Sequence, residues 1–324
     1  MGMPPLAFCD NNLALWGKEV EGLKVFGPAS AAQMFPGAVF MVAIWHPSRT
    51  EGIRHHIAEL QKAGCKEVTC FIPLFWRYPE LFLPNMFWEV PGRLAGQTAQ
   101  INAARKLLDQ AGREEFDRQL RLHQLGDVFS LRDPEPGLQY FPKDLVTLSA
   151  GETFVDCGAY DGDTIRDFLE ASGGCFRRIL ALEPDSQNLA KLQTSNHDER
   201  VSVLPYAASA RNETLRMSSS GPSSAISESG TIEIQCRVLD DLLADEQPTF
   251  IKMDIEGSEI DALLGAKETI RRLRPKLAIC VYHRPDHLWN IPLLLKELLP
   301  DSQLSLRSHM LDGFDTVCYC LPHS

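Results

Sequence analysis

Residues 153–164 read TFVDCGAYDGDT, a short apolar run that leads directly into a turn with two glycines. The apolar start predicts a buried strand, Asp156 falls at its carboxyl end, and Thr164 opens a helix. Ligands bind at this edge of a parallel sheet, where a glycine lets the backbone approach them closely. The stretch therefore predicts a ligand-binding strand edge in an α/β fold.

The spacing of this turn, D-x-G-x-x-D-G-D, narrows the class of ligand. It is neither the G-x-G-x-x-G of a dinucleotide site nor the G-x-x-x-x-G-K-[ST] of a P-loop. The loop carries acidic residues and no lysine, which disfavours a phosphate-rich ligand.

The composition bounds the class of protein. The chain has 324 residues, enough for about two domains, and its 32 basic and 43 acidic side chains give a net charge of −11. This charge argues against nucleic acid and anionic membranes as partners. The longest apolar runs, such as 38–45 and 277–282, fall far short of the ~20 residues of a membrane span, so we expect a cytoplasmic protein. Nine cysteines without a C-x-x-C pair predict buried, reduced thiols.

The sequence pattern divides the chain into three parts. Residues 1–77 alternate strand and helix patterns and resemble part of a small Rossmann-like α/β domain, without the glycine-rich turn that would hold a nucleotide phosphate. Residues 78–143 are rich in helical spacing and predict a connector that covers the catalytic cleft. The proline-rich stretch 132–142 marks the boundary, and a second α/β domain is expected over 144–324.

Alternating elements continue through this second domain. Strands are expected at 177–183, 201–209, 249–257, 276–283, 303–309 and 315–321, with helices at 165–171, 185–195, 258–273 and 288–299. Glu183 then ends the strand next to Asp156, which suits an acceptor of ribose hydroxyls.

Six motifs in this domain resemble the FkbM family of S-adenosylmethionine-dependent methyltransferases. They are FVDCGAYDGDT, ALEPDSQNLAKL, YAAS, VLDDLL, IKMDIEGSEIDALLGA and CVYHRPDHLW, in family order. The resemblance implies a class I methyltransferase sheet of seven strands with an antiparallel last strand. It also implies methyl transfer to a hydroxyl, often on a sugar or a secondary metabolite.

The resemblance also implies a cofactor site. Asp156 and the glycine turn would hold the methionine portion, Glu183 and Pro184 would face the ribose, and Ala207 and Ala208 would form a wall for adenine. Asp161 departs from many relatives, which carry a neutral residue there. The implied cofactor-binding residues are Asp156, Gly158, Ala159, Asp161, Gly162, Thr164, Glu183, Pro184, Ala207 and Ala208.

Candidates for catalysis lie at the next two strand ends. Methyl transfer to a hydroxyl needs alignment and removal of a proton. We predict His283 as the base, with Asp254 and Glu256 orienting it or the acceptor. The same three side chains could instead bind magnesium, which we favour less, so no metal is included in the predicted site.

The remaining polar and aromatic residues of the two catalytic motifs are expected to have structural roles. His287 and His309 are expected to cap or brace neighbouring elements, and Trp289 and Tyr282 to pack in the core. Lys252 is expected to extend its stem towards solvent without a functional role.

These features predict an O-methyltransferase that uses S-adenosylmethionine and acts on a hydroxyl of a sugar, glycan or glycosylated metabolite. The alternative is a non-catalytic scaffold that binds a nucleotide-sugar or a partner protein.

Overall fold

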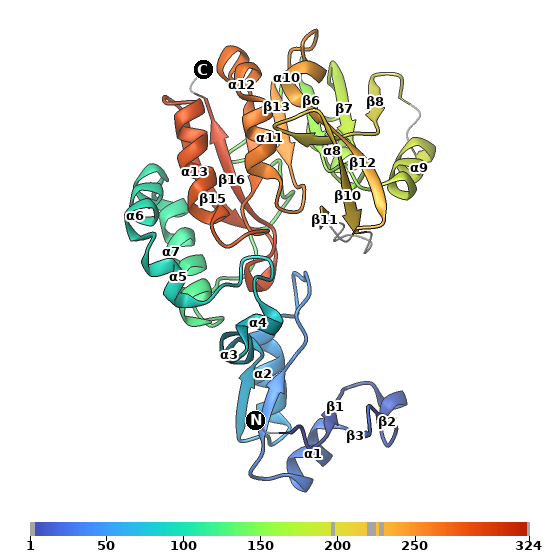
Figure 1. Cartoon of the computed structure of the whole chain (residues 1–324), viewed down its shortest axis with the longest axis vertical. Coiled ribbons are helices and arrows are strands. Elements are labelled where there is room, and N and C mark those ends of the chain that lie inside the picture. The colour runs from blue at the N-terminus through green and yellow to red at the C-terminus, as the bar shows by residue number, and fades with distance from the viewer. Residues whose placement is uncertain (1–3, 196–197, 219–224, 227–229, 323–324) are drawn as a thin grey trace.

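The computed structural model describes residues 4–195, 198–218, 225–226 and 230–322. A large α/β body forms one end of the molecule, and a smaller front unit, drawn in blue, extends from it (Figure 1). None of the helices in these ranges is both long and apolar enough to cross a lipid bilayer.

The body is built on a seven-stranded sheet. Its strands in chain order are β6 (Thr153–Cys157), β7 (Arg178–Leu182), β8 (Val201–Leu204), β13 (Phe250–Met253), β14 (Lys276–Cys280), β15 (Gln303–Ser308) and β16 (Thr316–Leu321).

The spatial order of this sheet is β15-β16-β14-β13-β6-β7-β8. Strand β16 runs antiparallel to both neighbours, and the other pairs are parallel. This arrangement confirms the predicted class I methyltransferase sheet. The chain leaves β6 in one direction through β7 and β8, then returns to β13 on the other side. The edge between β6 and β13 is therefore the switch point at which ligands bind in such sheets.

Six helices and a second, smaller sheet complete the body. The helices are α8 (Asp163–Ser172), α9 (Ser186–Ser195), α10 (Leu239–Leu242), α11 (Glu259–Gly265), α12 (Lys267–Leu273) and α13 (His287–Leu298). The small sheet consists of β9 (Ala207–Ser209), β10 (Glu213–Ser218), β11 (Ala225–Ile226) and β12 (Ile232–Val238). The single strand expected over 201–209 is thus two strands of different sheets, because Pro205 interrupts the run between them.

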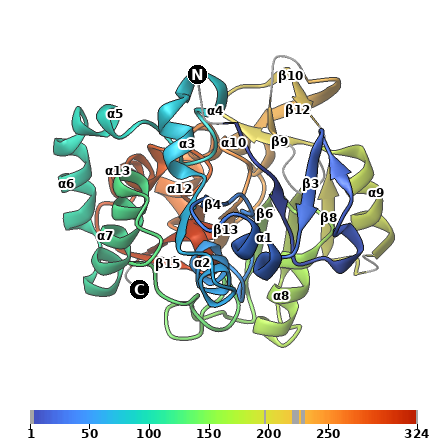
Figure 2. The same cartoon turned by 90° about the horizontal axis from the view of Figure 1, so that it is seen from below.

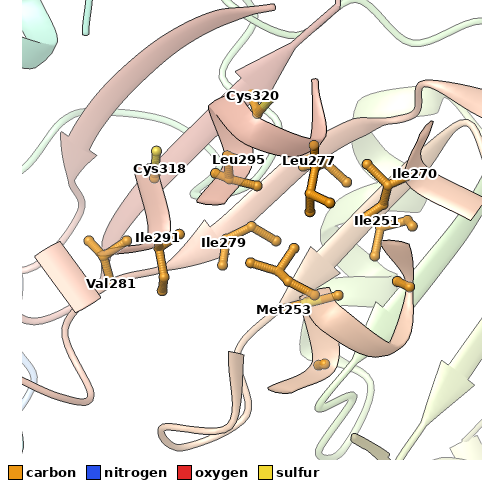
Figure 3. Packing of buried hydrophobic residues seen from close by; sticks show 14 of the residues in the cluster. Ile251, Met253, Ile270, Leu277, Ile279, Val281, Ile291, Leu295, Cys318 and Cys320 are labelled. Atoms are coloured by element: carbon orange, nitrogen blue, oxygen red, sulfur yellow. The ribbon is translucent and has the colours of Figure 1, made fainter. Parts of the chain in front are cut away.

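Both faces of the large sheet are apolar, as expected for a parallel sheet that helices cover on both sides. On one face, Ile251, Met253 and Ile279 pack against Ile291 and Leu295 of α13 (Figure 3). Cys318 and Cys320 lie in the same cluster, and all nine cysteines are unpaired, seven of them buried. The other face packs the rings of residues such as Phe154 and Phe250 against α8.

The connector is helical, as predicted. It contains α4 (Pro79–Phe82), α5 (Pro91–Ala95), α6 (Thr98–Leu107) and α7 (Gln110–Leu125). Helices α5 to α7 lie beside α13 and β15 (Figure 1). Asp109 N–H donates to the carbonyl of Leu304, which joins the connector to the edge strand β15.

The front unit differs in detail from the expectation. It comprises β1 (Phe8–Cys9), β2 (Glu19–Val20), β3 (Leu23–Phe26), α1 (Pro28–Met34), β4 (Val39–Val42), α2 (Ile53–Lys62), β5 (Glu67–Cys70) and α3 (Ile72–Arg77). These strands form two separate sheets, β1-β3-β2 and β4-β5. The apolar run VTCFIPLF (68–75) is typical of a strand, but the strand ends at Cys70, and Pro73 lies in the first turn of α3, where proline is well tolerated.

The front unit contacts the body at a loop that follows β15. Ile53 N–H at the start of α2 donates to Asp312 Oδ2 over 2.8 Å. The ring of Trp45 lies 4.8 Å from that of Phe314. Viewed from below, helix α2 projects onto the middle of the body (Figure 2). The loop over 311–315 therefore links the front unit to the strand edge.

Candidate active site

The glycine turn lies directly against the end of β13. Gly158 has a φ of +83°, and a Cβ on it would lie 2.0 Å from the carbonyl oxygen of Asp254. Asp254 N–H donates to the carbonyl of Cys157 over 3.1 Å. Only glycine permits this approach, so the turn after β6 and the first residue after β13 share one edge.

Asp156 faces a buried lysine. Lys252 Nζ lies 3.0 Å from Asp156 Oδ1 and donates to the carbonyl oxygen of Gly158 over 2.8 Å. Both side chains are almost completely buried. The expectation that Lys252 extends to solvent is therefore wrong. Burial raises the pKa of Asp156 to about 6, although the positive charge of Lys252 opposes the rise. The predicted contact of Asp156 with the cofactor ammonium stays a prediction.

Glu183 closes the turn from the neighbouring strand end. Its Oε2 accepts from Tyr160 N–H over 2.9 Å, and its Oε1 accepts from Asp185 N–H over 2.9 Å. Each carboxylate oxygen keeps a second lone pair. The pKa of Glu183 is raised by burial, and the two N–H donors counteract this. The carboxylate is thus oriented and can still accept further hydrogen bonds.

The other predicted cofactor residues lie around this turn or beyond it. Gly162, with a φ of +87°, precedes α8, and Thr164 is buried in its first turn. Asp161 pairs with Arg166 over 2.9 Å. Ala159 is buried in the turn, Pro184 follows Glu183, and Ala207 and Ala208 lie in β9 rather than in the large sheet.

The structure brings the three predicted catalytic side chains together. His283 Nε2 lies 3.2 Å from Asp254 Oδ1 and 3.8 Å from Glu256 Oε2. The His283 ring is 2% exposed, whereas the Asp254 and Glu256 side chains are 27% and 30% exposed. Glu256 has a φ of +54°, a left-handed conformation that is strained for glutamate. Such strain is often found at functional sites.

Glu259 is the main residue that sequence reasoning did not single out. It is fully buried at the start of α11, and its Oε1 bonds His283 Nδ1 over 2.7 Å. Its Oε2 lies 3.2 Å from Nδ1 of His287, which is buried as expected of a structural residue. The Glu259 carboxylate also accepts from Ile255 N–H, so one group fixes both histidines and the loop with Glu256. Its position in the acidic stretch DIEGSE (254–259) was the feature of the sequence that could have pointed to it.

Tyr140 enters the site from the stretch that precedes β6. Its hydroxyl donates to Asp254 Oδ2 over 2.8 Å, and its ring lies 5.1 Å from Lys252 Nζ. Tyr282 donates to Asp254 Oδ1 over 3.4 Å. No sequence motif pointed to Tyr140, because its role depends on how residues 139–141 pack under the sheet.

Burial and the neighbouring charges shift the pKa values of His283, Asp254 and Glu256. Burial lowers the pKa of His283, but the carboxylates of Glu259 and Asp254 outweigh burial and hold it well above its ordinary value. Burial would raise the pKa of Asp254, yet His283 and Lys252 bring it well below its usual range. Burial raises the pKa of Glu256 to about 7.

A pocket of about 430 Å³ opens beside this cluster. One wall comes from residues between 84 and 97, including α5, and the other from Glu256 and residues 283–289. Trp289 Nε1 donates to Gln97 Oε1 over 2.7 Å and joins the two walls. The connector thus forms one wall of the pocket beside the strand edge.

The comparisons with known proteins agree with this arrangement. Residues 156–309 match the family model of the methyltransferase FkbM domain. Residues 156–309 of this chain are an FkbM methyltransferase domain. The crystal structure of methyltransferase FkbM from Methylobacillus flagellatus is 25% identical in sequence and superposes with a TM-score of 0.78, covering 97% of this chain and 83% of that one. The likeness to that FkbM protein extends over the front unit and the connector.

More distant structures share parts of the methyltransferase fold. An rRNA methylase from Streptococcus thermophilus has 13% identity and a TM-score of 0.35, with coverage of 55% of this chain and 90% of that one. A SAM-dependent methyltransferase from Aquifex aeolicus has 13% identity and a TM-score of 0.32, with coverage of 69% and 98%. These scores are too low to bear on function. No curated protein matches the sequence.

Proposed function

We propose that this FkbM methyltransferase uses S-adenosylmethionine to methylate a hydroxyl of a small polar acceptor, such as a sugar, a glycan or a glycosylated metabolite. The observation that carries the proposal is the pocket lined by Glu256 and His283, because His283 also contacts Asp254, whose backbone packs against the glycine turn.

The cofactor half of the proposal rests on the turn and on Glu183. The ribose of S-adenosylmethionine offers two hydroxyl donors, and Glu183 has lone pairs left to accept them. The close approach at Gly158 leaves the turn without a side chain that would obstruct the methionine portion. When bound, the cofactor supplies the methyl group as an activated sulfonium.

The acceptor half rests on the lining of the pocket. Its volume of about 430 Å³ is within the range of roughly 300–1,000 Å³ that holds small ligands. Glu89, Arg93 and Gln97 on one wall face Glu256 and Arg284 on the other. Such a lining supports an acceptor with many hydroxyls better than an apolar one, because each polar group needs a hydrogen-bond partner when it is covered.

The acceptor oxygen must be aligned and must lose its proton. Asp254 is braced by Tyr140, and His283 is braced by Glu259, so both groups are fixed in position before an acceptor arrives. The predicted role of His283 as base, with Asp254 and Glu256 orienting it or the acceptor, stays part of the proposal. Because the carboxylates hold the pKa of His283 well above its ordinary value, the ring has to lose its proton before it can act as the base.

Changing Glu183 to alanine should weaken cofactor binding. Loss of a charged acceptor for two hydroxyls costs about 1.5–3 kcal/mol, which corresponds to roughly ten- to hundredfold in dissociation constant. Isothermal titration with S-adenosylmethionine measures the change, and Glu170→Ala on the exposed face of α8 is the control. Equal affinity of the Glu183 variant and the wild type would contradict the assignment.

Changing His283 to alanine should lower turnover by about 10²- to 10⁴-fold, the usual contribution of a positioned acid-base group. Cofactor affinity should remain within about twofold, since the proposed cofactor contacts, Glu183 and the glycine turn, follow other strands of the sheet than His283 does. Rate measurements at saturating cofactor, together with titration, separate the two effects. Full activity would remove His283 from the mechanism.

The proposed function itself is tested by mass spectrometry. Candidate sugars and glycosylated metabolites are incubated with the protein and S-adenosylmethionine whose methyl group is isotopically labelled. A product heavier by one labelled methylene unit supports O-methylation. Absence of cofactor binding would refute it, and cofactor binding without any product would favour the non-catalytic scaffold.

A further inference from the structure

His283 presents one ring nitrogen to two carboxylates without a hydrogen bond of good geometry. Within the described ranges, His283 Nε2 is buried and has no hydrogen-bond partner, although Asp254 Oδ1 and Glu256 Oε2 lie 3.2 Å and 3.8 Å away. The other nitrogen, Nδ1, is occupied by Glu259 at 2.7 Å. A buried nitrogen aimed between carboxylates requires either a proton or a cation.

We propose that His283 Nε2, Asp254 and Glu256 bind a divalent metal ion at the wall of the acceptor pocket. With the ion bound, His283 is a ligand rather than the base, because its Nδ1 is held by Glu259 and its Nε2 by the ion. The ion then activates the hydroxyl in place of the base, and its binding can be tested without an acceptor. From the sequence, a metal site made of these side chains was the less favoured alternative. The contact between His283 and Glu259 now favours the metal site, because it leaves Nε2 of His283 to face the carboxylates.

The distances suit a metal ion. An ion bound at about 2.1 Å in octahedral geometry has neighbouring ligand atoms about 3.0 Å apart. The separations from His283 Nε2 to the two carboxylates are 3.2 Å and 3.8 Å. The Glu256 carboxylate, which is outside the group of ligand atoms that already lie within 4.8 Å of one another, has to move towards Asp254 to complete the set. Asp254, Glu259 and His283 can also each place one ligand atom within 4.8 Å of the other two.

Glu259 has the position of a group that orients a metal ligand. A ligating histidine usually donates its second ring N–H to a carboxylate, which fixes the tautomer and leaves the other nitrogen free to bind. Glu259 does this for His283 while it also accepts from Ile255 N–H. Its Oε1 is held by these two partners, and its Oε2 lies 3.2 Å from His287 Nδ1, so we assign it to this supporting position rather than to the ion.

The ligand set limits the identity of the ion. One imidazole nitrogen with two carboxylates combines a donor typical of transition metals with donors that manganese and magnesium prefer. Mn²⁺ accepts both kinds of donor, and we therefore use it as the probe. Glu256 and His283 both line the pocket, so open coordination positions would face the acceptor. There the ion would polarise the hydroxyl and favour its ionised form.

The test is a titration of the full chain with MnCl₂ after removal of metals with EDTA, with free Mn²⁺ followed by electron paramagnetic resonance. We expect one Mn²⁺ per chain. Glu256→Gln keeps the size of a partly exposed side chain and should weaken binding at least tenfold, as should His283→Ala. Glu259→Gln should weaken it by about 10- to 100-fold, the usual effect of losing such a supporting group.

His309→Gln is the matched control, because His309 is also buried and its side chain hydrogen-bonds only Tyr319 Oη among the described hydrogen bonds. Its affinity for Mn²⁺ should equal that of the wild type. Circular dichroism confirms that each variant is folded, and Glu256→Gln remains informative if His283→Ala is not. Absence of a stoichiometric site, or Mn²⁺ affinity unchanged in Glu256→Gln and His283→Ala, would overturn the proposal. In that case His283 carries a proton on Nε2.

Discussion

Replacement of Lys252 by methionine is expected to lower the free energy of unfolding by about 3–5 kcal/mol. The substitution removes the only cation in contact with Asp156 among the described residues, so a fully buried carboxylate loses its counterion. The hydrogen bond from Lys252 to the carbonyl of Gly158 is lost as well. Urea denaturation followed by circular dichroism measures the change.

Two further variants separate the charge effect from general damage to the core. Arg105→Met breaks the pair with Asp117, whose two side chains are 41% and 44% exposed, so its effect should be clearly smaller. Adding Asp156→Leu to Lys252→Met removes both charges and should restore much of the stability, because a buried pair can often be replaced by apolar residues. Lack of any such recovery would show that the pair is not the cause.

Gly158→Ala should be at least as damaging and should also abolish cofactor binding. Its Cβ would lie 2.0 Å from the carbonyl oxygen of Asp254, which belongs to the backbone and cannot rotate away. The turn and the end of β13 would have to separate. We expect a loss of about 4 kcal/mol or more, within the range seen only for severe substitutions. Thermal denaturation and titration with S-adenosylmethionine measure the two effects.

The chain offers matched controls for this glycine. Gly173 and Gly174 also have positive φ values, +60° and +72°, but a Cβ on either would meet no atom within 4 Å. Alanine at these positions should cost only the backbone term of about 1–2 kcal/mol. If Gly158→Ala cost no more than these controls, the contact between the turn and Asp254 would not matter for stability.

Much of the methyltransferase fold follows from the sequence because its strands are short, apolar and bounded by clear turns. The seven strands could be predicted from this pattern, and the antiparallel last strand was implied by the family resemblance. The convergence of Asp254, Glu256 and His283 at one edge could also be predicted. The carboxyl ends of neighbouring parallel strands necessarily meet there.

The sequence-based predictions were wrong or incomplete where contacts between residues far apart in the chain determine the position of a side chain. Lys252 was expected to reach solvent, since the sequence does not reveal that Asp156 of the adjacent strand provides a buried counterion. Tyr140 lies in no motif. It contacts Asp254 because the neighbouring Phe141 packs against Phe154 and Phe250 on one face of the sheet. In the front unit, strand pairs as short as two residues carry too little pattern to be recognised.

The hydrogen bond from Ile53 N–H to Asp312 has a consequence for how the protein can be divided. The first turn of α2 is capped by a residue that lies 259 positions later, within a loop whose neighbour Phe314 packs on Trp45. A methyltransferase fragment that began at Asp144 would lose Tyr140 from the site and would expose Asp312 and Phe314. The segment that matches the family and the segment that folds as a unit need not be the same. Here the strand edge that carries Asp254 and His283 is completed by residues outside the family motifs.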